Sequence, residues 1–175
     1  MTDGRGYFSG RTLVPILQTL PAESHGVEIG VCRGSGMLYT LEDCPNISLL
    51  YGVDPWKEYP EMTQAEVDIA YAECVIRIKP MIDCGRAKIL RMPSLEAVKL
   101  FENEWVDYIF VDGQHTKPAV VNDLGAWVPH VRSGGIVSGD DWGIPGVAEG
   151  VREYRERTGI TSELIILGGC WYWIK

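Results

Sequence analysis

Short apolar runs alternate with helix-like segments along most of the chain, and this alternation is the feature that most constrains its fold. Apolar runs typical of buried strands occupy residues 27–31, 47–53, 87–90, 105–111, 136–139, 163–167 and 170–174. Apolar residues at helical spacing predict helices over residues 10–20, 63–84, 94–101, 118–131 and 147–158, with a further helix from Gly36. Strands separated by helices predict a mostly parallel sheet that is covered on both faces.

The end of the chain adds one exception to this parallel arrangement. Gly168 and Gly169 separate the last two apolar runs, and a two-glycine turn is a hairpin signal. We therefore expect an α/β fold, a three-layer sandwich around a mostly parallel seven-stranded sheet with one antiparallel C-terminal strand.

Composition favours one compact domain over residues 1–175, with residues 1–26 as a helical extension and residues 27–175 as the core. The chain has 175 residues, of which 46% are hydrophobic. Its net charge is -8, so the chain lacks the positive charge that drives binding to nucleic acid, and we expect no nucleic-acid partner. No apolar run is long enough to cross a bilayer. The five cysteines form no C-x-x-C pair, which favours reduced thiols in a cytoplasmic protein.

Acidic residues follow three of the predicted strands directly. Asp54 follows the second strand, Asp112 the fourth, and the pair Asp140 and Asp141 the fifth. Ligands of open parallel sheets bind beyond the carboxyl ends of the strands, near the point where the strand order reverses. Clustered carboxylates repel one another unless a cation or a proton offsets them, so this rim is a candidate site. Alternatively, Asp140 and Asp141 cap the next helix.

A glycine-rich turn follows the first strand, in the segment Val-Glu-Ile-Gly-Val-Cys-Arg-Gly-Ser-Gly over residues 27–36. Gly30, Gly34 and Gly36 allow the backbone to turn tightly and to approach a ligand at the N-terminus of a helix. Their spacing differs from G-x-G-x-x-G, and an ordinary strand-to-helix turn is the alternative. Asp54, which can accept hydrogen bonds from ribose hydroxyls, favours a cofactor that contains a ribose.

This segment resembles the first motif of the class I S-adenosylmethionine-dependent methyltransferases, in which an acid precedes the glycines. Three further segments match in order and spacing: Tyr-Gly-Val-Asp-Pro-Trp at residues 51–56, Phe-Val-Asp-Gly-Gln-His at 110–115 and Gly-Gly-Ile-Val-Ser-Gly-Asp-Asp-Trp at 134–142. Together they resemble the small-molecule O-methyltransferase branch that includes catechol and macrolide-sugar enzymes. The resemblance covers about residues 27–142 and implies a Rossmann-like fold.

The resemblance also implies how S-adenosylmethionine is held. Glu28 and Gly30 would lie near the methionine moiety, Asp54 would bind the ribose, and residues 92–94 would face the adenine. The full set of implied cofactor contacts is Glu28, Gly30, Gly34, Ser35, Asp54, Pro55, Trp56, Ser94 and Asp112. Ser94 is in addition a capping-type residue at the start of the helix expected over residues 94–101.

A metal site and a base are implied in the same way. Asp112, Asp140 and Asp141 resemble the carboxylates that hold a divalent cation in the metal-dependent members of that branch. Hard cations such as Mg²⁺ take oxygen ligands, and a chelated hydroxyl loses its proton more readily. His115, three residues after Asp112, could remove that proton near neutral pH. The implied catalytic residues are therefore His115 and Asp112.

The function expected from the resemblance is O-methylation of a small molecule such as a sugar, a polyol or a catechol-like compound, assisted by a divalent cation. Three alternatives remain open at this point: a metal-independent methyltransferase with His115 as the only base, an NAD-dependent oxidoreductase with the same glycine turn, and a non-catalytic binding module. About 26 residues precede the first strand, which is short for this branch, so either the pocket is open or a partner subunit covers it. The aromatic residues within 55–60 allow a homodimer.

Overall fold

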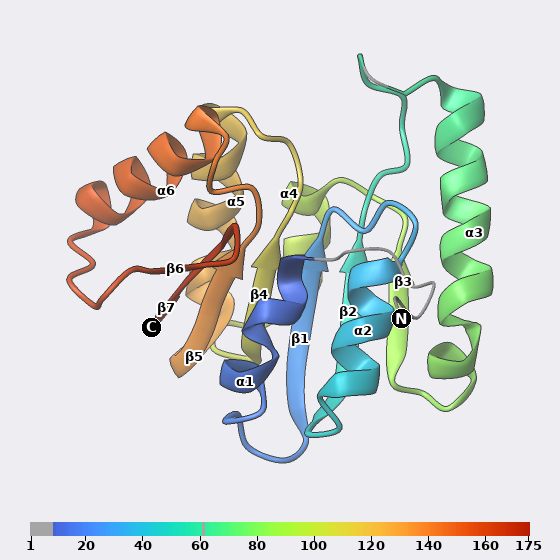
Figure 1. The fold of residues 1–175 in the computed structure, drawn as a ribbon, viewed down its shortest axis with the longest axis horizontal. Coiled ribbons are helices and arrows are strands. Elements are labelled where there is room, and N and C mark those ends of the chain that lie inside the picture. Colours follow the sequence, from blue (N-terminus) through green and yellow to red (C-terminus); the bar gives the residue numbers. More distant parts are fainter. Residues whose placement is uncertain (1–8, 61) are drawn as a thin grey trace.

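The computed structural model describes residues 9–60 and 62–175, and these residues form a seven-stranded sheet with helices on both faces (Figure 1). The strands are β1 Ser24–Ile29, β2 Ile47–Val53, β3 Ala87–Leu90, β4 Val106–Val111, β5 Val131–Gly139, β6 Ile165–Leu167 and β7 Cys170–Ile174. Their order is β3-β2-β1-β4-β5-β7-β6. Strands β1 to β5 pair in parallel, and β7 pairs antiparallel with both β5 and β6. The predicted sandwich with one antiparallel strand is confirmed.

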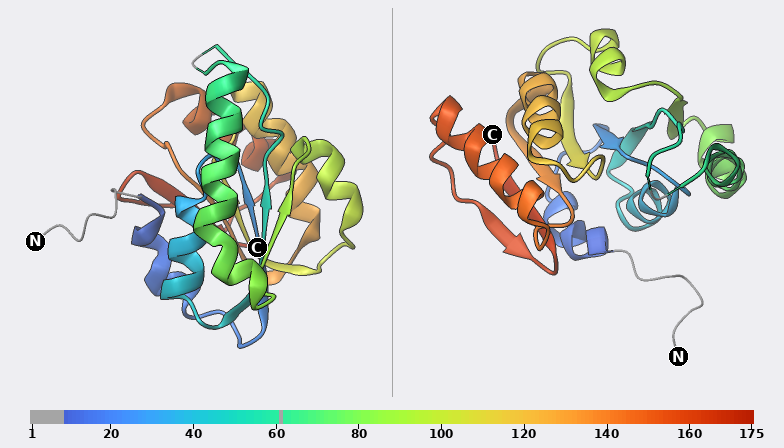
Figure 2. Two further views of the ribbon diagram at one scale, coloured as in Figure 1. Left: turned by 90° about the vertical axis from the view of Figure 1, so that its right-hand side faces the viewer. Right: turned by 90° about the horizontal axis from the view of Figure 1, so that it is seen from above.

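The helices are divided between the two faces of the sheet (Figure 2). One face carries the 3₁₀ turn Ser9–Leu13, α1 Val14–Leu17, α2 Ser35–Asp43 and α3 Gln64–Asp83. The other carries α4 Ser94–Ala97, which continues as the 3₁₀ turn Val98–Leu100, α5 Lys117–Trp127 with the turn Val128–His130, and α6 Pro145–Thr158. The strand order reverses between β1 and β4, and the helices on the two sides of this point cover opposite faces of the sheet. β1 and β4 are neighbours in the sheet although two strands separate them in the chain.

Each face of the sheet has its own apolar core, because successive side chains of a strand point to opposite faces. In β4, Ile109 and Val111 belong to the core beneath α5 and α6, whereas Tyr108 and Phe110 belong to the core beneath α2 and α3. Leu17 of α1 is buried in the second core, which ties the segment before β1 to the sheet. No helix among the described residues is long and apolar enough to span a membrane. All five cysteines are free thiols.

Two local expectations need correction. Ser94 does not cap α4, because the cap residue is Pro93 and Ser94 already lies inside the helix. Its hydroxyl instead donates a hydrogen bond to Asp123 of α5. Strand β5 begins at Val131 rather than Ile136, because Val131 pairs with Val106 before the register shifts near Gly134, which has a φ of 80°.

The register of the sheet brings the ends of β1, β2, β4 and β5, and so the acidic residues that follow three of them, to one edge. Ile29, at the end of β1, is paired with both Val53 of β2 and Val111 of β4, and Val111 is paired with Gly139 of β5. The residues that follow these strand ends therefore leave the sheet at one edge, beside the point where the strand order reverses.

Candidate active site

The glycine turn after β1 packs directly against the end of β4. Gly30 has a φ of 87°, and a Cβ atom added to it would lie only 1.9 Å from the carbonyl oxygen of Asp112. An L-residue is strained in this backbone conformation and would also collide with β4. Glycine at position 30 is thus what allows the turn to run beside Asp112, and α2 begins five residues further on, at Ser35, after Gly34 with a φ of 76°.

Asp54 holds this turn in place from the end of β2. Its Oδ2 accepts hydrogen bonds from the backbone N–H groups of Val31 and Cys32, both at 3.0 Å, and its Oδ1 accepts one from Trp56 at 2.7 Å. A carboxylate has about four acceptor positions, so Asp54 keeps capacity for a ribose hydroxyl. This bracing of the turn was not predicted from the sequence, since nothing local marks a contact over more than twenty residues.

Trp56 supports the same turn rather than presenting its ring at the rim. Its side chain is only 2% exposed and packs edge-to-face against Tyr71 of α3. Its indole N–H donates to the carbonyl oxygen of Cys32 at 2.9 Å. The φ of Trp56 is 44°, which turns the chain back so that the ring enters the core. The ring of Trp56, an implied cofactor contact, therefore lies in the core, and the exposed Pro55 is the residue of the pair that lies at the surface.

Glu28 is a buried acid beneath the first turn of α2. It is 3% exposed, and a Cβ atom on Gly36 would lie 2.6 Å from its Oε1. Burial raises the pKa of Glu28 well above its usual value, and the negative charge of Asp112 raises it further, which favours the protonated carboxyl. Its Oε2 has no hydrogen-bond partner among the described residues. A buried polar atom without a hydrogen-bond partner is costly in a folded protein and is typical of a ligand site.

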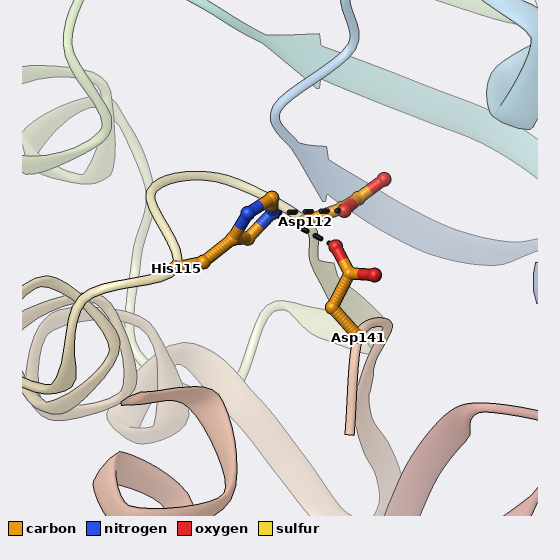
Figure 3. A group of neighbouring side chains, drawn as sticks. All are labelled: Asp112, His115 and Asp141. Atoms are coloured by element: carbon orange, nitrogen blue, oxygen red, sulfur yellow. Dashed lines mark ion pairs between the residues drawn. The ribbon is translucent and has the colours of Figure 1, made fainter. Parts of the chain in front are cut away.

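Three side chains from two loops converge on the other side of the turn (Figure 3). The Nε2 of His115 lies 2.9 Å from Oδ2 of Asp141 and 3.9 Å from Oδ1 of Asp112. One ligand atom from each of these residues falls within 4.8 Å of the others. A nitrogen and two carboxylate oxygens at such separations are a donor set that a divalent cation can use.

The crowding of acidic side chains in this group shifts the pKa values of Asp112 and His115. The pKa of Asp112 is raised from 3.8 to about 6, chiefly by burial and in addition by the neighbouring carboxylates of Asp140 and Asp141, while His115 lowers it. The pKa of His115 is raised above its ordinary 6.5, chiefly by the nearby carboxylate of Asp112 and also by the charge of Asp141. Both shifts favour bound protons, which is the response of acidic groups crowded around a place that a cation could fill.

Asp140, the third predicted metal ligand, lies outside this group. Its Oδ1 accepts the backbone N–H of Asp141 at 2.8 Å and the thiol of Cys170 at 3.6 Å. Asp141 has a φ of 57°, so the backbone reverses between the two residues. In this structure Asp141 and His115 join Asp112, and Asp140 is directed toward β7.

Ser94, the predicted adenine contact, is linked to an acid, Asp123, that was not predicted from the sequence. Asp123, at 8% exposure, accepts the Ser94 hydroxyl, and its Oδ2 is 3.5 Å from where a Cβ of Gly113 would lie. Asp123 therefore contacts both the start of α4, which follows β3, and the loop that follows β4. A signal existed, because Asp123 occupies a core-facing position of α5 between Val120 and Trp127.

The fold and the rim together define a class of protein. An open α/β sheet that carries a glycine turn, an acid at the end of the second strand and a polar cluster across the switch point has the architecture of a cofactor-binding enzyme. Residues 27–142 match a family model described as a methyltransferase domain. The chain belongs to this family, and it is a class I S-adenosylmethionine-dependent methyltransferase. None of the curated proteins compared with the chain matches it.

Solved structures similar to the chain have the same fold. An O-methyltransferase from Bacillus cereus in complex with S-adenosylhomocysteine has a TM-score of 0.66 at 15% identity, over 98% of this chain and 84% of that one. The O-methyltransferase TomG from Streptomyces achromogenes has a TM-score of 0.66 at 14% identity, over 99% and 83%. The O-methyltransferase NovP has a TM-score of 0.64 at 17% identity, over 94% and 75%. At these identities the likeness shows the Rossmann-like methyltransferase fold.

Proposed function

We propose that this methyltransferase transfers the methyl group of S-adenosylmethionine to a hydroxyl of a small polyhydroxylated or catechol-like molecule, with the help of a divalent cation. The observation that carries the proposal is the contact between Gly30 and Asp112, which places the glycine turn and the cluster of Asp112, His115 and Asp141 side by side. The similar structures NovP and TomG are both described as O-methyltransferases, and the TomG structure contains S-adenosylmethionine.

The residues at the turn fit the cofactor. The unpartnered Oε2 of Glu28 and the close passage of Gly30 and Gly36 leave polar and backbone groups for the methionine moiety. Asp54 has acceptor capacity left for the ribose, with Pro55 beside it. Gly34 and Ser35 form the N-terminus of α2, where free N–H groups and the helix dipole favour a carboxylate. Ser94, positioned by Asp123, would lie at the adenine end.

The rim cluster fits a cation such as Mg²⁺. Asp112 and Asp141 supply oxygens, and His115 beside them is the base; the group is part-exposed, with 28%, 39% and 44% of the side chains of Asp112, Asp141 and His115 accessible. A cation bound there would lower the pKa of a chelated substrate hydroxyl. Asp112 and Asp141 would hold the acceptor side of the site, and the turn from Gly30 would hold the methyl donor in line with it, so that much of the acceleration comes from positioning.

His115 is the group able to take the hydroxyl proton. Its imidazole accepts a proton only in the neutral form, and the proton moves from the substrate oxygen to a ring nitrogen while that oxygen forms its bond to the methyl carbon. The bond between the methyl carbon and sulfur breaks, and its electron pair stays on sulfur. Asp141 orients the imidazole and stabilises the imidazolium that results.

The distance of 2.9 Å between His115 and Asp141 also favours a second candidate mechanism, in which these two residues act without a cation. In that case Asp112 would accept a hydrogen bond from the substrate. Transfer measured after exhaustive chelation separates the two mechanisms: loss of activity that Mg²⁺ restores supports the cation, and full activity supports the pair alone.

The experiment that tests the function is methyl transfer from labelled S-adenosylmethionine to a panel of catechols, sugars and polyols. We expect a labelled ether product with at least one member, and its loss in Asp112→Ala. Calorimetric titration with S-adenosylhomocysteine and with NAD is the companion measurement. Tight NAD binding without a response to S-adenosylhomocysteine would contradict the proposal and revive the oxidoreductase alternative, and unchanged biological activity of Asp112→Ala would favour a binding module.

A further inference from the structure

The outer face of α3 carries an apolar stripe opposite the face that the helix buries. Ile69 and Ile76 are 55% and 74% exposed, whereas Val67, Cys74 and Ile78 on the inner face are buried. Ala65 and Ala72 are also exposed. Positions 65, 69, 72 and 76 recur at intervals of four, three and four residues, which places them along one line of a helix. Figure 2 shows α3 outermost on its side of the molecule.

This stripe has the pattern of an interface between two helices rather than of a solvated surface. Isolated exposed apolar residues are ordinary, but large residues that alternate with alanines at heptad spacing are typical of helices that pack closely against another helix. The inner face of the same helix already supplies its packing on the sheet, through α2 and β3. Folding of the chain therefore does not account for the second stripe.

The charges that flank the stripe are arranged so that the helix complements itself. On one flank Glu66, which accepts hydrogen bonds from Thr63, lies in the N-terminal half and Arg77, which donates to Ser35, in the C-terminal half. On the other flank Asp68 and Lys79 are distributed in the same way. If a second α3 packs antiparallel, with its two-fold axis near Ala72, the acidic half of each flank faces the basic half of the same flank in the other copy. Glu73, which lies near that axis, is already paired with Arg33.

We propose that this face of α3 is the interface of a symmetric dimer, in which two copies of the chain pack their α3 helices antiparallel. Ile69 of each copy then lies against Ile76 of the other, and the alanines allow the backbones to approach. An isologous contact of this kind needs one self-complementary patch, which is what α3 offers. The ion pairs that Asp68 and Lys79 make within the chain, with Arg91 and Asp83, are exposed and can rearrange at little cost.

The interface is narrow, which sets the expected strength of the dimer. A helix of 20 residues is about 30 Å long. A single helix pair of that length buries less than the roughly 1,600 Å² of a standard interface, so we expect association in the range of about 10 to 100 µM. Sedimentation equilibrium from about 5 to 500 µM should therefore show a transition from 19.5 kDa to twice that mass.

The stripe is tested by Ile76→Glu, with Ile166→Glu as the matched control. Ile166 is 41% exposed on β6, at the far edge of the sheet, so the same substitution there leaves α3 intact. We expect Ile76→Glu to weaken dimerisation at least tenfold and Ile166→Glu to leave it unchanged. A wild-type chain that stays monomeric to 500 µM, or a dimer that tolerates Ile76→Glu, would overturn the proposal.

The antiparallel register is tested by charge reversal. Asp68→Lys and Lys79→Asp each place like charges opposite one another, so each alone should weaken the dimer several-fold. The double variant restores opposite charges and should return the affinity to within about threefold of the wild type. Both positions are exposed, and near-UV and far-UV circular dichroism checks that each variant is folded. Additive weakening in the double variant would contradict this arrangement.

Discussion

The Nε2 of His115 lies 2.9 Å from Oδ2 of Asp141, although the two residues leave the sheet from different strands. This pair joins the loop after β4 to the loop after β5, and Asp112 completes the cluster from the β4 side. Either Asp141 and Asp112 hold a cation beside His115, or His115 and Asp141 act without a cation as an oriented base. Which role dominates decides how the active site should respond to substitution, to pH and to metal.

The first prediction concerns the ligands of the cation. Asp112→Asn and Asp141→Asn each remove one anionic oxygen from the cluster, so each should lower the affinity for Mn²⁺ at least tenfold in a calorimetric titration. Asp140→Asn is the matched control, because the carboxylate of Asp140 is directed to the N–H of Asp141 and to Cys170. An equal loss in Asp140→Asn would mean that Asp140 turns into the site when a cation binds.

The second prediction concerns stability against pH in the metal-free protein. The pKa of Asp112 is raised from 3.8 to about 6 on folding, so the folded state favours the protonated carboxyl. Stability from this group is fully present below pH 3.8 and is lost as the pH rises through about 6. At pH 7.5 in chelator, Asp112→Asn should therefore be more stable than the wild type, by at most ~3 kcal/mol in urea unfolding.

The same comparison in the presence of Mn²⁺ should reverse this order. A cation that binds only the folded wild-type protein stabilises it by mass action, and the variant gains less because its site is weakened. A variant that is less stable than the wild type at pH 7.5 in chelator would show that the Asp112 carboxylate is already well compensated without a cation.

The third prediction concerns Gly30. Gly30→Ala forces a Cβ atom into the carbonyl group of Asp112 at a φ that disfavours side chains, so it should destabilise the fold by more than ~2 kcal/mol. Gly125→Ala is the control, since a Cβ atom there meets nothing within 4 Å and the residue lies inside α5. That variant should be neutral or up to about 1 kcal/mol more stable. Equal losses in both variants would argue against the close packing of β1 and β4.

The fourth prediction concerns Asp54. Asp54→Ala leaves two backbone N–H groups of the turn, and that of Trp56, without their acceptor, so the turn should lose its cofactor-binding shape. We expect the affinity for S-adenosylhomocysteine to fall at least tenfold by calorimetry, while Glu156→Ala, an exposed acid on α6, leaves it unchanged. Undiminished affinity in Asp54→Ala would show that neither the bracing of the turn nor the ribose contact depends on this residue.

Much of the fold could be predicted because its signals are local. Apolar runs, glycine turns and helical spacing each involve neighbouring residues, and parallel pairing follows from their alternation. The positions of Asp54, Asp112 and Asp140 directly after strands were enough to place them on one rim. Segment ends were harder, since Val131 joins β5 only through its pairing with Val106, which is distant in the sequence.

The finer assignment of the site could not be made in this way. Asp140 and Asp141 are adjacent and chemically identical, and only the reversed backbone at Asp141 decides which carboxylate meets His115. Trp56 follows a strand, as a rim residue should, yet its own positive φ turns its ring into the core. The partnership of Ser94 with Asp123 joins α4 to α5 and likewise depends on the tertiary fold.

The central claim is that a methyl donor and a cation occupy adjacent places on this rim. A crystal structure grown with S-adenosylhomocysteine and Mn²⁺, with an anomalous difference map, tests it most directly. The account predicts density for the cofactor along the turn from Gly30 to Gly36. It also predicts an anomalous peak within bonding distance of the carboxylates of Asp112 and Asp141, beside the sulfur of S-adenosylhomocysteine. An anomalous peak elsewhere, or a cofactor bound away from this turn, would contradict it.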